Sequence, residues 1–104
     1  MEKIKHGKLC PIAKTLEIIG GKWTILIIRD LLKKPRRFLE LQKTIGGANP
    51  RTLSARLKEL EERGIIKKKI YPEIPPHTEY TLTKKGLSLS GVLEQMKKWG
   101  QRAN

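Results

Sequence analysis

A run of basic and small polar side chains between residues 51 and 58 has the clearest chemical potential in this sequence. Arg51, Ala55 and Lys58 recur at helical spacing, with Thr52, Ser54 and Arg56 beside them. Basic side chains can donate to guanine O6 and N7, and a small residue admits a thymine methyl group. We predict that this helix contacts DNA, with bases read by Arg51, Thr52, Ser54, Ala55 and Lys58 and the backbone held by Arg56.

The sequence around these residues predicts a helix over 50–63. Asn49 can accept at the N-cap, and Pro50 suits the first helical position. An apolar stripe follows at helical spacing (Leu53, Leu57 and Leu60). Gly64 can then adopt the left-handed conformation that commonly ends a helix. The basic face therefore lies opposite a leucine stripe that must be buried; an ordinary amphipathic surface helix is the alternative.

Two strand-like runs follow this helix, at 65–71 and 78–83, and a proline-rich stretch separates them. They predict a basic β-hairpin, so that helix and hairpin together form a winged helix-turn-helix. Strand alternation places Lys67 and Lys69 on one face and Lys68 on the other, where Lys68 must reach the sheet margin to stay hydrated. The wing residues expected to contact the DNA backbone are Lys67, Lys69 and His77. Alternatively, the prolines only protect a sheet edge.

The remaining elements are helices that position this unit. Apolar periodicity and Gly or Pro breaks predict helices over 10–19, 22–33 and 37–45, and one final helix from residue 83 to about 99. The fold class is mainly α with a small β-hairpin, and 36–38 is a candidate extra strand. One domain over 10–100 would carry a basic arm at 1–9 and a tail at 101–104. Near the third helix, we expect contacts to the DNA phosphate backbone from Arg36, Arg37 and Lys43.

The overall charge points to a polyanionic partner. The chain of 104 residues has 23 Lys and Arg against 10 Asp and Glu, a net charge of +13. Double-stranded DNA is the first candidate. A nonspecific nucleic-acid-binding or architectural protein, an anionic membrane surface and a merely solubilising lysine surface are the alternatives. The basic residues are spread over several elements, which disfavours a membrane-binding amphipathic helix.

The sequence lacks the residue patterns that other classes of function require. The sequence shows no nucleophile–base set, phosphate loop or metal-ligand spacing, so we expect no enzyme, no cofactor and no metal site. It also has no apolar run of 18 residues and no apolar signal core, which indicates the cytoplasm.

Cys10 is the single cysteine and precedes Pro11 at the predicted start of a helix. A helix N-terminus and the nearby Lys5, His6 and Lys8 favour the thiolate. Cys10 is therefore a candidate sensor of oxidants or electrophiles, and a small capping residue is the alternative.

Taken together, several motifs resemble the HxlR family of prokaryotic transcriptional regulators, which is related to MarR-type repressors. The matching stretches are Cys10-Pro11, Gly20-Gly21-Lys22-Trp23-Thr24, Pro35-Arg36-Arg37-Phe38, the 50–60 helix, 71–76 and 79–86. The resemblance implies a regulator that binds a palindromic operator as a homodimer, with a small-molecule or oxidant effector. It also implies a dimer interface on the first and last helices, at Ile12, Leu16, Ile19, Leu89, Val92, Met96 and Trp99.

Overall fold

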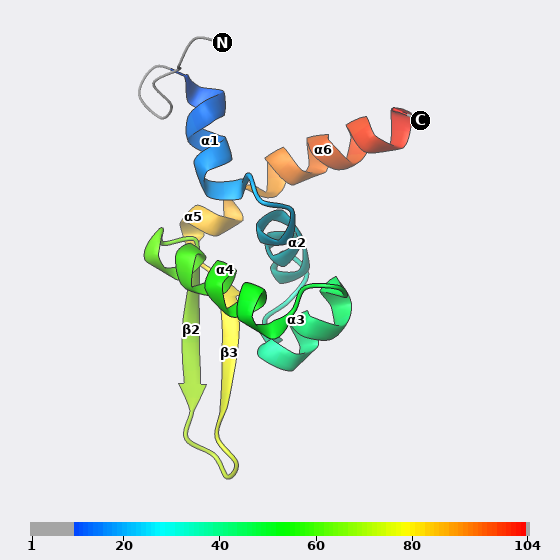
Figure 1. The fold of residues 1–104 in the computed structure, drawn as a ribbon. Helices are drawn as coiled ribbons and strands as arrows, with labels where there is room; N and C mark the ends of the chain where they lie inside the picture. Colours follow the sequence, from blue (N-terminus) through cyan, green and yellow to red (C-terminus); the bar gives the residue numbers. More distant parts are fainter. Residues whose placement is uncertain (1–9, 104) are drawn as a thin grey trace.

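Helices and one small sheet build this protein, and the computed structural model describes residues 10–103 (Figure 1). The elements in chain order are α1 (Pro11–Ile19), α2 (Lys22–Leu31), β1 (Arg36–Arg37), α3 (Phe38–Ile45), α4 (Pro50–Glu62), β2 (Ile66–Tyr71), β3 (His77–Leu82), α5 (Lys84–Leu87) and α6 (Ser90–Arg102). The proposed arm at 1–9 lies outside the described residues. Among residues 10–103, no helix is long and apolar enough to cross a membrane.

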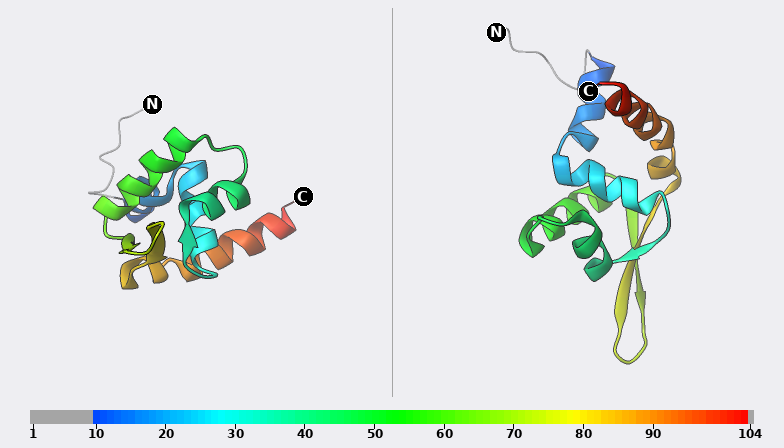
Figure 2. Two further views of the ribbon diagram at one scale, coloured as in Figure 1. Left: turned by 90° about the horizontal axis from the view of Figure 1, so that it is seen from below. Right: turned by 90° about the vertical axis from the view of Figure 1, so that its right-hand side faces the viewer.

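The sheet has the strand order β1-β3-β2 and is antiparallel throughout. The extra strand expected near residue 36 is present, because Arg36 pairs with Tyr80 and Arg37 with Glu79. The hairpin extends well beyond the helical body, as the right-hand view of Figure 2 shows. The winged helix-turn-helix predicted from the sequence is therefore the observed fold.

The core lies between α2, α3, α4 and the base of the hairpin. Its fully buried side chains include Ile27 and Ile28 from α2, Leu41 from α3, and Leu53 and Leu57 from α4. The α4 stripe is buried as its period predicted. The central helix α2 ends at Leu31, two residues before the end expected from its apolar run.

The prediction of one continuous C-terminal helix was wrong. The chain forms the short helix α5, turns at residues 88–89, and starts α6 at Ser90, which runs to Arg102 rather than to Trp99. Tertiary contacts explain the break. Thr83 Oγ1 accepts from Gly86 N (3.1 Å) and donates to Gly64 O (2.6 Å), which holds α5 against the base of the hairpin. The helix α6 then leaves in another direction (Figure 1).

Asp30 joins three elements and was not singled out in the sequence. It is 2% exposed, although its side chain is a carboxylate. Its carboxylate forms an ion pair with Arg29 (3.0 Å) and accepts from Thr44 Oγ1 of α3, while its backbone carbonyl accepts from Arg36 Nε (3.5 Å). Buried charges persist in proteins when they are paired and hydrogen-bonded. The end of α2 is thereby tied to α3 and to β1.

The start of α3 gives a prediction about acid stability. Arg37 N donates to Glu40 Oε1 (2.8 Å), and this bond lowers the pKa of Glu40 below its usual 4.5, with smaller contributions from Lys34, Arg36 and Arg37. A lowered folded-state pKa stabilises the fold above the unfolded value and loses that stabilisation as pH falls through the folded value. We expect Glu40→Gln to be less stable than the wild type at neutral pH, and the difference to shrink below about pH 4.5. Urea unfolding at several pH values measures it; a difference that grows toward low pH would contradict this assignment.

Candidate nucleic-acid interface

The outer face of α4 presents the residues that the sequence predicted as base readers. Asn49 Oδ1 accepts from Thr52 N (2.8 Å), so the predicted N-cap starts the helix. Arg51, Ser54, Ala55 and Lys58 are exposed, opposite the buried leucines. A helix N-terminus directed at DNA also adds partial positive charge toward phosphate. The structure therefore brings these four side chains onto one open face.

Arg56 and Thr52 lie at the margins of that face and are half-buried. Arg56 Nη1 forms an ion pair with Glu59 Oε1 at 2.7 Å. Arg56 also lines a pocket beside the turn between α1 and α2. It thus belongs to a flank of α4 rather than to the outer face of the helix.

The far end of α4 is acidic and turns toward the sheet. Burial raises the pKa of Tyr80, and the negative charge of Glu61 adds to the same effect. Basic residues at the start of α4 and acidic ones at its end give the helix a charge gradient. A polyanion is therefore attracted more strongly to its first turns than to its last one.

The hairpin carries its lysines clear of the core. Lys67, Lys68 and Lys69 are all exposed, and on the face shared with Lys68 only Ile66 is buried, whereas Ile70 is 65% exposed. Lys68 pairs with Tyr80, which packs against the core, yet Lys68 itself is exposed, whereas the outer part of the same face is open to solvent at Ile70. All three ammonium groups are available to a polyanion.

The tip of the hairpin is fixed by a small side-chain cluster. The rings of Tyr71 and His77 stack with centroids 4.6 Å apart, and His77 Nδ1 lies 3.1 Å from Glu73 Oε1. Tyr71 OH donates to Glu79 Oε1 (3.1 Å), and Lys69 Nζ lies 5.0 Å from the centre of the Tyr71 ring. His77 therefore closes the loop through internal contacts. Sequence reasoning missed this cluster, because its partners meet only when the strands pair.

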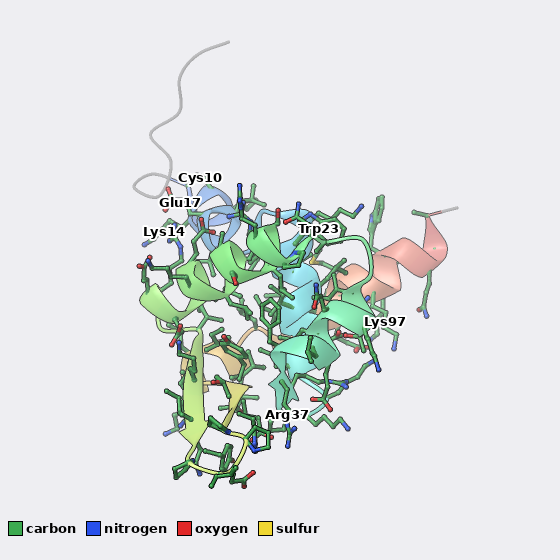
Figure 3. The ribbon with its side chains drawn as sticks, turned by 60° about the horizontal axis from the view of Figure 1, so that its bottom comes forward. Cys10, Lys14, Glu17, Trp23, Arg37 and Lys97 are labelled. Atoms are coloured by element: carbon green, nitrogen blue, oxygen red, sulfur yellow. The ribbon has the colours of Figure 1, made fainter. Side chains whose placement is uncertain are left out.

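The basic residues around α3 divide into two kinds; Arg36 and Arg37 precede the helix, and Lys43 lies in its last turn. Arg37 and Lys43 are exposed, and Arg37 lies at the hairpin side of the molecule (Figure 3). Arg36 is half-buried and donates to the backbone of Asp30. Arg37 and Lys43 are thus free to meet a phosphate, whereas Arg36 also has a structural bond.

Cys10 lies at the N-cap of α1, where its Sγ accepts from Ala13 N at 3.4 Å. It is partly exposed, and Figure 3 places it at the opposite end of the molecule from Arg37. The capping interpretation thus describes its geometry. Lys5, His6 and Lys8, which the sensing hypothesis also used, lie outside the described residues.

The residues predicted for a dimer interface are only partly available. Ile19 is 7% exposed and packs into the core of its own chain, and Leu89 also packs against that core. The others leave large apolar surfaces open, at 72% for Ile12, 56% for Leu16 and 65% for Trp99. Val92 and Met96 extend the exposed strip along α6, which buries none of its residues.

Comparisons with known proteins agree with this architecture. The HxlR-like helix-turn-helix family model matches residues 18–104. An HTH-type transcriptional regulator of Halalkalibacterium halodurans is 46% identical over 99 residues, covering 94% of this chain and 88% of the relative.

Solved structures show the same similarity. A protein assigned to the MarR family of transcriptional regulators from Porphyromonas gingivalis superposes with a TM-score of 0.87 at 39% identity, over 97% of this chain and 98% of its own. The redox regulator HypR in its oxidised form gives 0.85 at 37% identity, over 91% and 97%. The family match spans most of the chain and includes α4 and the hairpin. This chain therefore belongs to the HxlR-like helix-turn-helix family of transcriptional regulators.

Proposed function

We propose that this protein binds a palindromic DNA operator as a homodimer and regulates transcription from it. The observation that carries the proposal is the exposed basic and small polar face of α4 beside a hairpin whose three lysines are all exposed. This arrangement suits a helix in the major groove and a wing on the neighbouring backbone.

In this proposal the residues of α4 recognise the DNA sequence. Arg51, Thr52, Ser54, Ala55 and Lys58 read base edges. Contacts to phosphate come from Arg36, Arg37, Lys43, Arg56, Lys67, Lys69 and His77. Such contacts fix the register on the duplex and carry little sequence information.

The exposed apolar strip on α6 and the outer face of α1 support the homodimer. Large exposed apolar patches of this kind mark interaction surfaces. A two-fold axis would bring the same patch of each chain together and place two recognition helices about 34 Å apart, one turn of DNA. The operator would then be an inverted repeat.

A selection of binding sites from random duplex DNA tests this function. We expect enrichment of an inverted repeat, and affinity for it that falls steeply with salt. Tight, salt-sensitive binding with no enriched sequence would instead identify a nonspecific nucleic-acid binder.

Trp99 gives a direct test of the dimer. Its side chain is 65% exposed, so Trp99→Glu should leave the monomer folded while placing two carboxylates in the proposed interface. We expect sedimentation to show a shift from dimer to monomer, together with at least about tenfold weaker operator binding. Leu39→Glu is the control for the sedimentation readout, because Leu39 is 69% exposed on α3 and lies outside the proposed interface. A Trp99→Glu protein that stays dimeric would exclude this surface.

Cys10 is proposed as the redox-responsive group. Its Sγ takes part in the start of α1, so oxidation there would alter a helix assigned to the interface. With one cysteine in the chain, a disulfide must join two chains or capture a small thiol. We expect mild oxidation by diamide in the presence of glutathione to weaken operator binding in the wild type and not in Cys10→Ser. Equal loss in both proteins would remove Cys10 from the regulation.

A further inference from the structure

A pocket of about 290 Å³ lies where the turn between α1 and α2 meets the flank of α4. It is separate from the outer face of α4. Gly20, Gly21 and the first turn of α2 form one wall, and Arg56 of α4 and Arg63, the C-cap of that helix, contribute to the other. Neither glycine has a side chain to cover the backbone at this point.

The first wall offers backbone donors. The N-cap of α2 is Gly21, which has no side chain to accept a hydrogen bond, and the first backbone bond of the helix runs from Ile25 N to Gly21 O (3.1 Å). Within residues 10–103, the N–H groups of Lys22, Trp23 and Thr24 therefore have no acceptor in the protein. Such groups carry the positive end of the helix dipole.

Thr24 adds a hydroxyl group to the same space. It is 6% exposed, and its Oγ1 forms no hydrogen bond with any residue from 10 to 103. In that part of the chain every fully enclosed side-chain polar atom has a partner, so this hydroxyl is not fully enclosed, and Thr24 is one of the residues that line the pocket. A Cβ atom placed on Gly21 would lie 3.2 Å from Thr24 Oγ1 and 3.8 Å from Thr24 Cβ. The Thr24 hydroxyl group therefore points toward Gly21, at the start of α2.

The charges of the lining favour an anion. Lys22, Arg56 and Arg63 oppose Glu17 and Glu59, so the lining stays net positive. Glu59 holds Arg56 at 2.7 Å, in a half-buried position at the pocket. A guanidinium fixed in this way suits a tetrahedral oxyanion, whose oxygens can take several donors at once.

We propose that this pocket binds a phosphate group. The N–H groups of Lys22, Trp23 and Thr24 and the Thr24 hydroxyl donate to its oxygens. The guanidinium N–H groups of Arg56 that Glu59 does not occupy donate as well. The phosphate comes either from the DNA backbone or from a small phosphorylated molecule, because both present the same oxygens.

The test begins with the protein alone and inorganic phosphate, titrated at constant ionic strength and followed by the amide resonances of residues 22–24. We expect these resonances to shift and to saturate. Arg56→Gln should weaken binding about tenfold, as for the loss of one charge-assisted bond. Thr24→Val, which keeps the side-chain shape, should weaken it as well, and Thr24→Ser should restore it. Lys97→Gln is the matched control, since Lys97 lies on α6 and outside the lining of this pocket.

A second titration, with duplex DNA in phosphate-free buffer, separates the two sources. If DNA supplies the phosphate, the amides of residues 22–24 shift on the duplex in the wild type, and Arg56→Gln weakens that response together with a salt slope lower by about one. If a small molecule supplies it, inorganic phosphate still binds in the DNA complex. The proposal is overturned if residues 22–24 respond in neither titration, or if Arg56→Gln and Lys97→Gln behave alike. The first titration needs no DNA, so its outcome does not depend on operator binding.

Discussion

Gly86→Ala is expected to destabilise the protein by about 2–3 kcal/mol, the cost of overpacking a tight site. A Cβ at Gly86 would lie 2.2 Å from Ile65 O and 2.9 Å from Leu82 Cδ2. The first of these is a backbone atom that already accepts from Thr83 N and Thr83 Oγ1, so it cannot move without loosening the base of the hairpin. Thermal unfolding should show a melting temperature lower by about 10–20 °C for a domain of this size.

The matched control is Gly100→Ala in α6, where nothing lies within 4 Å of the added Cβ. Alanine is the better helix former, so this change should be neutral or stabilise by up to about 1 kcal/mol. If both variants lose stability equally, the close approach of Gly86 to Ile65 is not the cause.

Arg51→Ala is expected to reduce discrimination between operator and unrelated DNA by about 1–3 kcal/mol, the range for a side chain that reads a guanine edge. Arg51 is exposed in the first turn of α4, where a recognition helix meets the bases. Competition binding with the operator and with base-substituted operators measures the change. An equal loss on every sequence would move Arg51 from the base-reading set to the backbone set.

Lys69→Ala provides the contrast, because Lys69 lies on the hairpin. It should weaken binding to all sequences alike and lower the salt slope by about one. A selective loss on the operator alone would mean that the wing reads bases.

Local patterns in the sequence were sufficient for the helices that carry recognition. The leucines at 53, 57 and 60 fix which face of α4 is buried, and the exposed face follows from the same period. Asn49, Pro50 and Gly64 mark the ends of this helix through backbone preferences that need no tertiary contact.

Features that depend on distant partners could not be predicted in this way. The apolar pattern of residues 89–99 does not reveal the break between α5 and α6. The contacts that hold α5, from Thr83 to Gly64 and between Gly86 and Ile65, join residues far apart in the sequence. The partner of Asp30 is Thr44, 14 residues away. Arg56 and His77 were predicted from their positions on the helix and the hairpin, whereas Glu59 and the ring of Tyr71, which contact them in the structure, were not foreseen.

The hydrogen bonds from Thr83 to Gly64 and Ile65 affect how the two DNA-binding elements of one chain are spaced. They join the end of α4 directly to the base of the hairpin, so the helix and the wing of one chain keep a fixed distance from each other. In the proposed dimer, the spacing between the two half-sites depends on other contacts, those along α1 and α6. A change at the proposed dimer surface would therefore alter which half-site spacings the protein accepts. Each half-site would still be recognised by the same unit of helix and wing.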